Sequence, residues 1–450
     1  MIRMQVAEAA AVLEAQYSGP DAIFAGCSTD SRSVARDALF VALKGPVHDG
    51  HEHVGEARDR GAAAALVSRS LRRSVESSMP VIRVADTLQA LGRLSGAWRA
   101  RFDLPVIGVT GSNGKTTVKE MLAAILSAGA PVLATRGNLN NEIGLPLTLM
   151  ELGAEHRLAV IEMGANHAGE IARLAQLARP HVGVITQCAP AHLEGFGTIE
   201  GVARAKGELL THLDADGTAI INADDGFAPL WRELAGSRRR IEFAIDAHAE
   251  VRASWQQEDT GSRIEMTTPA GAVALRLALP GRHNVANAAA ATAAAIAVGA
   301  TSEAVVAGLE GMHPVPGRLE LKVLEGGARI IDDTYNANPA SLQAGLEVLA
   351  AFPGRHWLVL GDMAELGDEA PDFHRQAAKL VRDHGVDRLL TIGELSRLTT
   401  ISFGEGADHH ASMDELVESL GESLEPQTTV LIKGSRSMGL ERVVAALMVG

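Results

Sequence analysis

The chain has 450 residues, a length that predicts about three domains. Apolar residues make up 46% and charged residues 21% of the chain, the usual balance of a globular protein whose domains each bury a core. The net charge of −14 excludes a general nucleic-acid binder, which needs a basic surface to displace the counterions of the phosphate backbone. Local backbone N–H groups and a few cations can still hold a nucleotide.

The chain contains two cysteines, Cys27 and Cys188, too few for a disulfide framework, and we expect a cytoplasmic protein. The N-terminal stretch carries Glu8 and Glu14 in an Ala-rich, helix-like pattern without the apolar block of a signal peptide. No apolar run reaches the roughly 18 residues that a membrane span requires. The Ala-rich stretch 286–298 is therefore interpreted as a buried helix.

The first block, residues 1–100, is expected to be a small α/β domain. It holds short strand-like runs separated by polar, Gly-rich loops, and it ends in a helical stretch through Leu91 and Trp98. The predicted strands are 38–43, 63–67 and 81–84.

The second block, residues 101–312, alternates apolar runs with helical patterns, which indicates a doubly wound α/β domain. Continuous apolar runs are typical of strands that are covered on both faces of a parallel sheet. Strands are expected at 104–109, 158–161, 182–185 and 218–221, and helices at 117–127 and 199–213.

The third block, residues 313–450, begins at a linker over 313–317 that contains two prolines and a glycine. Strand-like runs and helical patterns alternate again after this linker. We therefore expect a second, smaller α/β domain of Rossmann-like type, with strands at 330–332, 357–360, 389–392 and 429–432.

The strongest single signal is the sequence GVTGSNGKTT at residues 108–117, between a predicted strand and a predicted helix. Its glycines allow successive backbone N–H groups to face phosphate oxygens, and the helix N-terminus adds positive potential. We expect Lys115 to reach the β- and γ-phosphates and the Thr116 hydroxyl to bind Mg²⁺. The predicted nucleotide-binding residues of the loop are Gly111, Ser112, Asn113, Gly114, Lys115, Thr116 and Thr117.

This loop departs from the strict phosphate-loop pattern at Val109, where the pattern has glycine. A Gly-rich turn with an incidental lysine is the alternative interpretation. The loop indicates binding of a nucleoside triphosphate, but it does not distinguish a kinase from a ligase or a motor protein.

Three later residues are candidates by position alone. Glu162 ends a predicted strand, where α/β sheets carry ligand-binding groups, and its carboxylate suits Mg²⁺, although a capping or salt-bridged glutamate is the alternative. His192 follows another predicted strand and, on its own, is interpreted as a hydrogen-bonded loop histidine. Lys206 lies on a helical pattern, and because a cation beside metal ions is unfavourable, the pattern favours a solvated helix face.

Several motifs, in order along all three blocks, resemble the Mur ligase superfamily. TGSNGKTT at 110–117 and GNLNNEIGLP at 137–146 resemble the superfamily in general. The motifs EMGANH, HLEGFG, GRHNVAN and DTYNANP, at 162–167, 192–197, 281–287 and 333–339, look like the members that add D-alanyl-D-alanine. The resemblance implies ATP-dependent ligation of that dipeptide to UDP-N-acetylmuramoyl-tripeptide through an acyl phosphate, in peptidoglycan precursor synthesis.

The resemblance also implies a metal site. In the superfamily, the counterparts of Glu162 and His192 help to hold Mg²⁺, together with the phosphate-loop hydroxyl at Thr116. The counterpart of Lys206 is carbamylated by CO₂, which turns a cation into an anion able to bind Mg²⁺. The implied catalytic residues are Lys115, His192 and Lys206.

Further nucleotide contacts are implied on both sides of the linker. The counterpart of Asn287 contacts adenine, although helix capping or packing is the alternative for this residue. The counterparts of Arg318 and Asp333 reach the γ-phosphate and the ribose from the last domain. Charged residues are expected at a hinge between domains if closure of the domains assembles the site.

Two loops of the first block are implied to hold the UDP part of the substrate. Hydroxyls and an arginine fit a diphosphate, although the STDSR run by itself is also typical of a turn. The implied residues are Ser28, Thr29, Asp30, Ser31, Arg32, Asp49 and His51. In the last block, the peptide and the incoming amine are expected to contact Asn336, Asn338, Lys433 and Ser435.

The nearest alternatives are ligases of the same superfamily that add meso-diaminopimelate or lysine, and folylpolyglutamate synthetase. The EMGANH and NANP stretches favour the dipeptide-adding kind. An alternative from another class is a nucleotide-gated regulatory protein with slow hydrolysis. We expect ATP and Mg²⁺ as cofactors, the nucleotide-linked tripeptide and the dipeptide as substrates, no nucleic-acid partner, no membrane span, and a monomer.

Overall fold

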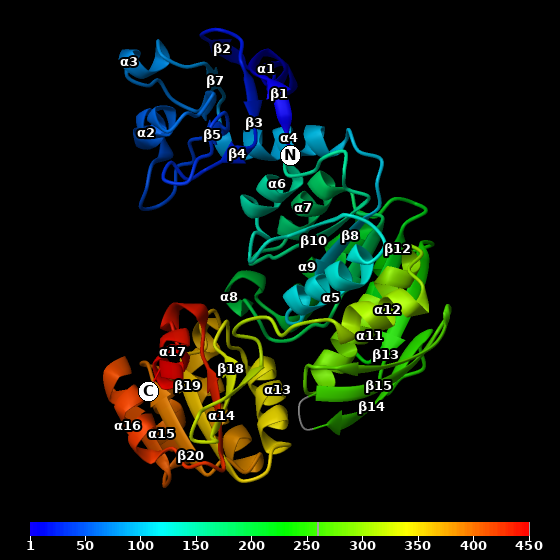
Figure 1. Cartoon of the computed structure of the whole chain (residues 1–450), viewed down its shortest axis with the longest axis vertical. Coiled ribbons are helices and arrows are strands. Elements are labelled where there is room, and N and C mark those ends of the chain that lie inside the picture. The colour runs from blue at the N-terminus through cyan, green and yellow to red at the C-terminus, as the bar shows by residue number, and fades with distance from the viewer. Residues whose placement is uncertain (259–260, 450) are drawn as a thin grey trace.

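The computed structural model describes residues 1–258 and 261–449, and these residues form four β-sheets in three successive α/β units (Figure 1). The N-terminal unit lies at the top of Figure 1, the central unit in the middle, and the C-terminal unit at the lower left. The predicted α/β fold class is thereby confirmed. Among the described residues, no helix is both long enough and apolar enough to cross a membrane.

The N-terminal unit contains a five-stranded sheet of order β2-β7-β6-β5-β4, parallel except for β2, and a small antiparallel β1–β3 pair. The strands predicted at 38–43, 63–67 and 81–84 are observed as β5, β6 and β7. Its elements are β1 (Arg3–Gln5), α1 (Val6–Leu13), β2 (Gln16–Ser18), β3 (Ile23–Ala25), β4 (Cys27–Ser28), β5 (Leu39–Val41), η1 (Gly50–His53), α2 (Val54–Asp59), β6 (Ala64–Val67), α3 (Arg73–Glu76), β7 (Val81–Arg83) and α4 (Thr87–Arg99).

The central unit is built on a nine-stranded sheet of order β16-β15-β14-β13-β12-β11-β8-β10-β9. All neighbouring pairs among strands β8 to β14 of this sheet are parallel. Its strands are β8 (Val106–Thr110), β9 (Val132–Ala134), β10 (Leu158–Glu162), β11 (Val182–Ile185), β12 (Thr218–Asn222), β13 (Arg239–Ala244), β14 (Val251–Glu258), β15 (Gly261–Thr268) and β16 (Gly271–Leu277). Its helices are α5 (Lys115–Ser127), α6 (Gly144–Leu149), α7 (Glu170–Ala178), α8 (Leu193–Phe196), α9 (Ile199–Thr211), α10 (Ala228–Ala235), α11 (Arg282–Ala297) and α12 (Ser302–Glu310).

The order of this sheet brings the predicted site together. Strand β8, which leads into the phosphate loop, lies between β10 and β11. Glu162 is the last residue of β10, and Thr186 follows β11. Because parallel strands end at the same edge, these residues and the phosphate loop lie side by side.

The antiparallel strands β14, β15 and β16 are an addition that the sequence did not predict. Buried and exposed residues alternate along β15 and β16, so the extension has one covered and one open face. The covered face packs against α11 and belongs to the same hydrophobic core as the central strands.

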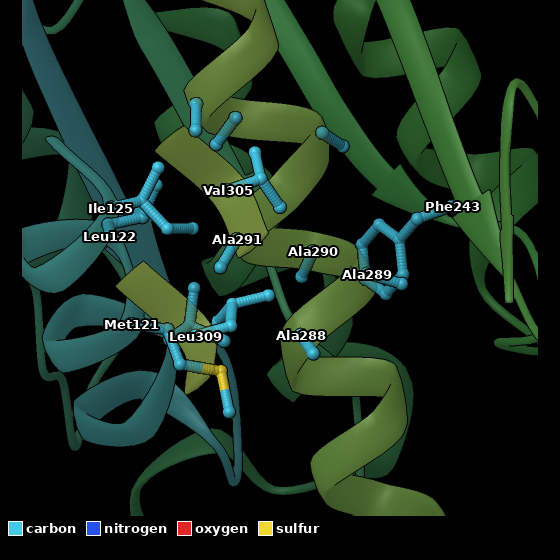
Figure 2. Packing of buried hydrophobic residues seen from close by; sticks show 14 of the residues in the cluster. Met121, Leu122, Ile125, Phe243, Ala288, Ala289, Ala290, Ala291, Val305 and Leu309 are labelled. Carbon is cyan, nitrogen blue, oxygen red and sulfur yellow. The ribbon is translucent and has the colours of Figure 1, made fainter. Parts of the chain in front are cut away.

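Helix α11 is the buried Ala-rich helix that the sequence predicted. Figure 2 shows Ala288 to Ala291 of this helix between Phe243 of β13 and the α5 side chains Met121, Leu122 and Ile125. Small side chains allow these elements to approach closely, and larger ones would force the backbone apart.

Gly308 of α12 marks the tightest approach in this core. A Cβ atom there would lie 2.4 Å from Ile125 Cα and 2.6 Å from Ile125 N, both backbone atoms of α5. We expect Gly308→Ala to destabilise the protein by about 1–3 kcal/mol, because the backbones must separate. Thermal or urea unfolding would measure this change.

Gly421 of α16 (Met413–Ser423) is the matched control, since nothing lies within 4 Å of a Cβ added there. Gly421→Ala is expected to be neutral or to stabilise by up to about 1 kcal/mol, because alanine favours helices over glycine. If Gly308→Ala stabilised the protein as much as Gly421→Ala, this result would contradict the close packing of α12 against α5.

The C-terminal unit is the expected second α/β unit, on a six-stranded sheet of order β17-β18-β22-β19-β20-β21 that is parallel except for β17. Its strands are β17 (Glu320–Val323), β18 (Arg329–Asp333), β19 (Arg355–Gly361), β20 (Arg388–Ile392), β21 (Ala407–His410) and β22 (Thr428–Lys433). Its helices are α13 (Pro339–Ala350), η2 (Gly367–Glu369), α14 (Ala370–Asp383), α15 (Ser396–Phe403), α16, η3 (Arg436–Met438) and α17 (Glu441–Val449).

The units are joined in two different ways. The N-terminal and central units share one hydrophobic core, and the Trp98 indole of α4 donates to the Leu152 carbonyl at 3.1 Å. The C-terminal unit instead has cores of its own and meets the central unit through polar side chains described below. Such polar interfaces are typical of domains that move relative to one another.

Candidate active site

The phosphate loop lies where the sequence predicted it, between β8 and α5. The helix begins at Lys115, two residues earlier than expected. The Lys115 ammonium donates to the carbonyls of Gly111, at 2.7 Å, and Ser112, at 3.2 Å, so it lies across the loop. Burial lowers the pKa of Lys115, as does the charge of Arg318, whereas the Glu162 carboxylate raises it.

Two glycines of the loop are required by their surroundings. Gly111 has a φ of +150°, and a Cβ there would lie 1.9 Å from the Thr186 hydroxyl oxygen. Gly114 has a φ of +83°, and a Cβ there would lie 2.4 Å from Asn287 Oδ1. Glycine alone therefore fits the loop between the end of β11 and helix α11.

Glu162 lies beside this loop with a side chain that is nearly inaccessible to solvent. Its Oε1 accepts a hydrogen bond from Asn140 Nδ2 at 2.7 Å, and its backbone N–H donates to the Thr135 hydroxyl. Its Oε2 is buried and has no hydrogen-bond partner among the described residues. A buried oxygen of this kind is costly unless a cation or another donor satisfies it, so the site suits a divalent metal ion.

Lys206 lies on α9 and is 1% exposed, so the predicted alternative of a solvated helix face is wrong. Its Nζ lies 5.3 Å from the centre of the Phe196 ring. Burial and the neighbouring Lys115 charge lower the pKa of Lys206 to about 7, against the opposing effect of Cys188 and two glutamates. A substantial fraction of the amine is therefore neutral at physiological pH.

His192 follows β11 and precedes the short helix α8, with a left-handed φ of +53°. Its Nδ1 lies 2.6 Å from Oε2 of Glu365, a residue of the C-terminal unit. The histidine holds the pKa of Glu365 below its usual value.

Lys115, Glu162, His192 and Glu365 line one cavity of roughly 610 Å³ between the central and C-terminal units, whereas Lys206 is buried beside Phe196 and is not part of the cavity lining. Within residues 1–258 and 261–449, no three His, Cys, Asp or Glu side chains form a group that could hold a metal ion. The predicted ligands Glu162 and His192 both line the cavity, and a metal site that used them would need a further ligand, such as a modified lysine or a hydroxyl.

Two asparagines of α11 lie next to the phosphate loop. Asn287 is 8% exposed and donates from Nδ2 to Asn284 Oδ1 at 3.3 Å, and Gly281 rather than Asn287 occupies the N-cap position. Both asparagines line the cavity together with His283, whose pKa burial lowers to about 4. The polar groups next to the loop are thus neutral amides and a neutral imidazole, which suits a nucleobase.

Arg318 extends from the C-terminal unit to the phosphate loop. Its Nη2 donates to the Thr116 hydroxyl at 2.9 Å, and its guanidinium lies 4.1 Å from the centre of the Tyr335 ring. The stacked ring keeps the guanidinium directed into the cavity, next to the expected triphosphate.

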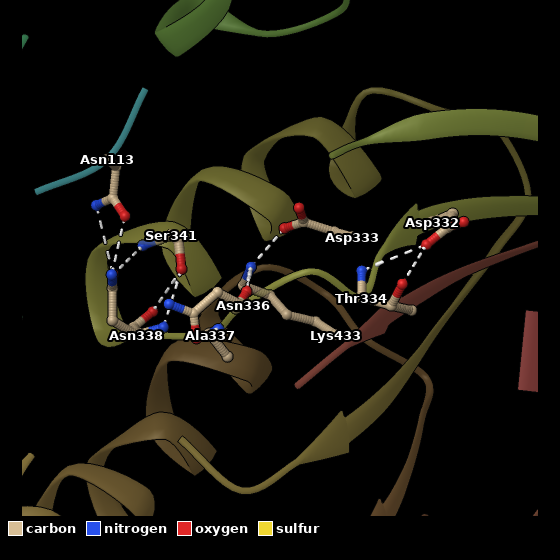
Figure 3. A network of polar contacts seen from close by, with 9 residues as sticks. All are labelled: Asn113, Asp332, Asp333, Thr334, Asn336, Ala337, Asn338, Ser341 and Lys433. Carbon is tan, nitrogen blue, oxygen red and sulfur yellow. Dashed lines mark hydrogen bonds and ion pairs between the residues drawn. The ribbon is translucent and has the colours of Figure 1, made fainter. Parts of the chain in front are cut away.

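A polar network in the C-terminal unit contacts the same loop (Figure 3). Lys433 Nζ donates to Asp333 Oδ2 at 2.5 Å and to the Asn336 carbonyl at 2.9 Å. Asn338 caps helix α13 and also donates from Nδ2 to Asn113 Oδ1 at 2.8 Å. The predicted residues of the third block therefore line the same cavity, and two of them, Arg318 and Asn338, touch the phosphate loop directly.

Ser435, the other candidate of this region, is 3% exposed and accepts a hydrogen bond from the Ala364 N–H at 2.7 Å. This bond ties the loop after β22 to the loop that carries Glu365. Arg436, which follows, lines the cavity as well.

The candidate substrate residues of the N-terminal unit form a separate group, outside this cavity. Asp30 accepts three hydrogen bonds from the backbone and guanidinium of Arg32, and the side-chain bond is the main reason that its pKa is lowered to about 2. The Ser28 hydroxyl accepts from the Asp30 N–H, and the Ser31 hydroxyl donates to Glu56. Thr29 lies between them, half-buried.

The second loop of this group is organised around a buried histidine. His51 Nδ1 lies 2.6 Å from Asp49 Oδ1, and His51 Nε2 accepts from the Ser68 N–H at 2.9 Å. Burial would raise the pKa of Asp49, but hydrogen bonds from His51 and the nearby Arg69 lower it to about 2. Asp49 is therefore charged in the physiological range, and the two loops after β4 and β5 present fixed polar groups.

Sequence reasoning missed three residues of the site. Asn140 stands in the GNLNNEIGLP motif, and a polar residue in that motif could have been singled out as a partner of Glu162. Thr186, which donates to the Asn113 carbonyl at 2.5 Å, could have been found from its position after β11. Glu365 carries no local signal, because only the docking of the C-terminal unit brings it to His192.

Comparisons with known proteins cover nearly the whole chain. Models of the Mur ligase family, catalytic domain, the Mur ligase middle domain and the Mur ligase glutamate ligase domain match residues 24–99, 109–295 and 317–436. The chain is 42% identical to the UDP-N-acetylmuramoyl-tripeptide--D-alanyl-D-alanine ligase of Escherichia coli (strain K12), over 99% of both chains.

Two solved structures are also similar. A crystal structure of MurF from Acinetobacter baumannii has a TM-score of 0.93 at 35% identity and 100% coverage of both chains. A structure of MurF ligase from Thermotoga maritima in complex with ADP has a TM-score of 0.83 at 27% identity, covering 94% of this chain and 97% of that one. The chain belongs to the Mur ligase family.

Proposed function

We propose that the protein is an ATP-dependent ligase that joins D-alanyl-D-alanine to UDP-N-acetylmuramoyl-tripeptide, giving ADP and phosphate. The observation that carries this proposal is the single cavity in which the phosphate-loop Lys115, the unsatisfied Glu162 carboxylate and C-terminal polar groups such as Lys433 meet. The relative from Escherichia coli, which bears the name of this activity, aligns over almost its full length.

The reaction has two steps. A carboxylate oxygen of the tripeptide attacks the γ-phosphorus of ATP, and ADP leaves, which gives an acyl phosphate with a usable leaving group. The dipeptide amine then attacks the carbonyl carbon, phosphate leaves, and the nitrogen loses its extra proton. The chain contributes charge and alignment in both steps, with Lys115 and Arg318 beside the phosphates.

We assign the metal ligands to Thr116, Glu162, His192 and a carbamylated Lys206. Bound Mg²⁺ would neutralise phosphate charge during transfer. The buried, unpartnered Oε2 of Glu162 supports this assignment, and so does the lowered pKa of Lys206, because only a neutral amine reacts with CO₂ to form a carbamate. Carbamylation would place an anion at this buried position, where the bound metal ion would balance its charge.

The remaining residues are assigned to three substrate parts. Asn287, Arg318 and Asp333 join the phosphate loop, residues 111–117, in holding ATP. The two N-terminal loops would hold the UDP group, and Asn336, Asn338, Lys433 and Ser435 the peptide and amine. We further propose units at 1–100, 101–312 and 313–450, a cytoplasmic location and a monomeric enzyme.

One assay tests the proposed function against its alternatives. Phosphate release is measured with ATP, Mg²⁺ and UDP-linked muramoyl tripeptide, with D-alanyl-D-alanine compared with single amino acids such as lysine, diaminopimelate and glutamate. We expect release with the dipeptide only. Release that needs neither carboxylate nor amine would instead indicate a nucleotide-gated regulatory protein.

A further inference from the structure

Glu365 is a charged residue of the cavity that the proposed mechanism does not use. It lies in the loop between β19 and α14, and its side chain is 52% exposed. Its φ of +63° is rare for a residue with a side chain and costs on the order of 1–3 kcal/mol. Its neighbours hold it there, because Ala364 bonds to Ser435 and Leu366 is 2% exposed.

The other carboxylates that line the cavity are each engaged with neighbouring residues. Asp333 is paired with Lys433, and Glu170 accepts from the Asn166 N–H and contacts His167. Glu162 bonds to Asn140 and is assigned to the metal. Glu365 contacts His192, with its Oε2 2.6 Å from the His192 Nδ1 atom.

The contact with His192 leaves Glu365 able to take a second partner, because its side chain remains 52% exposed. Glu365 lines the cavity together with the cations Lys115, Arg318 and Arg436. An incoming ammonium group is repelled by such a set unless an anion lies close to it.

We propose that Glu365 binds the ammonium group of the incoming dipeptide, an inference that rests on the ligase function proposed above. A free α-amino group has a pKa of about 7.7–8.0, so most of the dipeptide arrives as the cation. The position of Glu365 beside His192 brings that cation to the metal side of the cavity, where the acyl phosphate forms. The group that Glu365 recognises is therefore a primary α-ammonium group. No other charge on the ligand is required at this position.

The test compares two nucleophiles in Glu365→Gln. D-Alanyl-D-alanine is cationic near neutral pH, whereas hydroxylamine is largely neutral and converts an acyl phosphate to a hydroxamate. We expect the KM for the dipeptide to rise roughly ten- to hundredfold, as for loss of a charged hydrogen bond, with the KM for ATP and for the nucleotide-linked tripeptide unchanged. Hydroxamate formation should stay at the wild-type rate.

Two further variants complete the experiment. Glu365→Asp, which keeps the charge, should recover part of the dipeptide affinity. Glu369→Gln is the matched control, since Glu369 is exposed in the same loop but does not line the cavity. Thermal unfolding of each variant confirms that it is folded.

The outcomes are distinct. Equal loss with both nucleophiles would mean that Glu365 acts only by orienting His192, and an unchanged dipeptide KM would mean that it does not touch the amine; either result overturns the proposal. Failure of the wild-type enzyme to form either the peptide or the hydroxamate from ATP and the tripeptide would overturn the ligase function itself.

Discussion

Lys206→Ala is expected to lose at least about 10²-fold in the rate of phosphate release, the scale of removing one preorganised charge-stabilising group. Lys206 is 1% exposed, and its pKa is lowered to about 7, chiefly by burial. In the proposed mechanism the neutral amine becomes a carbamate that binds the metal ion, and alanine cannot supply that anion. Short carboxylic acids such as acetate should restore part of the activity, because they place a carboxylate in the space that the side chain leaves.

The modification can be observed without turnover. In ¹³C-bicarbonate, the wild-type enzyme should show a carbamate carbon resonance that Lys206→Ala lacks. The lowered pKa sets the sign of the pH dependence: protonation below about pH 7 removes the reactive amine, so the resonance should weaken as pH falls through that value.

The matched control is Lys379→Ala on α14, a lysine with a 75% exposed side chain that pairs with Asp383. This variant should keep wild-type turnover, because a surface ion pair contributes little. Full activity of Lys206→Ala, or a wild-type carbamate signal in it, would contradict the assignment of a modified lysine.

Much of the fold follows from local patterns. The strands β8, β10, β11 and β12 are continuous apolar runs, and each was predicted to within two residues because burial on both faces leaves no alternative to apolar side chains. The antiparallel extension β14–β16 was missed. Its alternating pattern is weaker, and its partner α11 lies later in the chain.

The candidate site was predictable only where chemistry and local structure coincide. The phosphate loop is such a case, since its glycines and Lys115 are needed within a few residues. Lys206 shows the opposite, because its residue pattern alone favours a surface position, and the resemblance to Mur ligases was needed to identify it. Its burial depends on α9 packing against the sheet, which no local pattern reports.

The residue pairs that join the units could not be predicted from local patterns. Asn338 meets Asn113, and Arg318 meets Thr116, across more than 200 residues of sequence. Both central partners belong to the phosphate loop, so docking of the C-terminal unit and nucleotide binding use the same polar atoms. Predicting these pairs requires the relative placement of two folded units, which sequence patterns do not contain.

Lys115→Ala is expected to lose about 10²–10³-fold or more in kcat, because it removes the cation nearest the transferred phosphoryl group. Among the residues that the structure describes, Lys115 Nζ bonds to the Gly111 and Ser112 carbonyls of its own loop. The substitution therefore removes a charge and does not disturb the packing of the core. The melting temperature of the variant should change little. Phosphate release measures the rate, and hydroxylamine trapping measures acyl phosphate formation.

Substrate binding separates this effect from general damage. The N-terminal loops around Asp30 and His51 lie outside the cavity that Lys115 enters. The affinity of Lys115→Ala for the UDP-linked tripeptide, measured by calorimetry without ATP, should therefore equal that of the wild type. Lys115→Arg keeps the charge on a bulkier planar group that cannot bond to two converging loop carbonyls in the same way, so it should recover little activity. Near-wild-type turnover of either variant would show that the phosphoryl group is stabilised elsewhere, with Arg318 the first residue to examine.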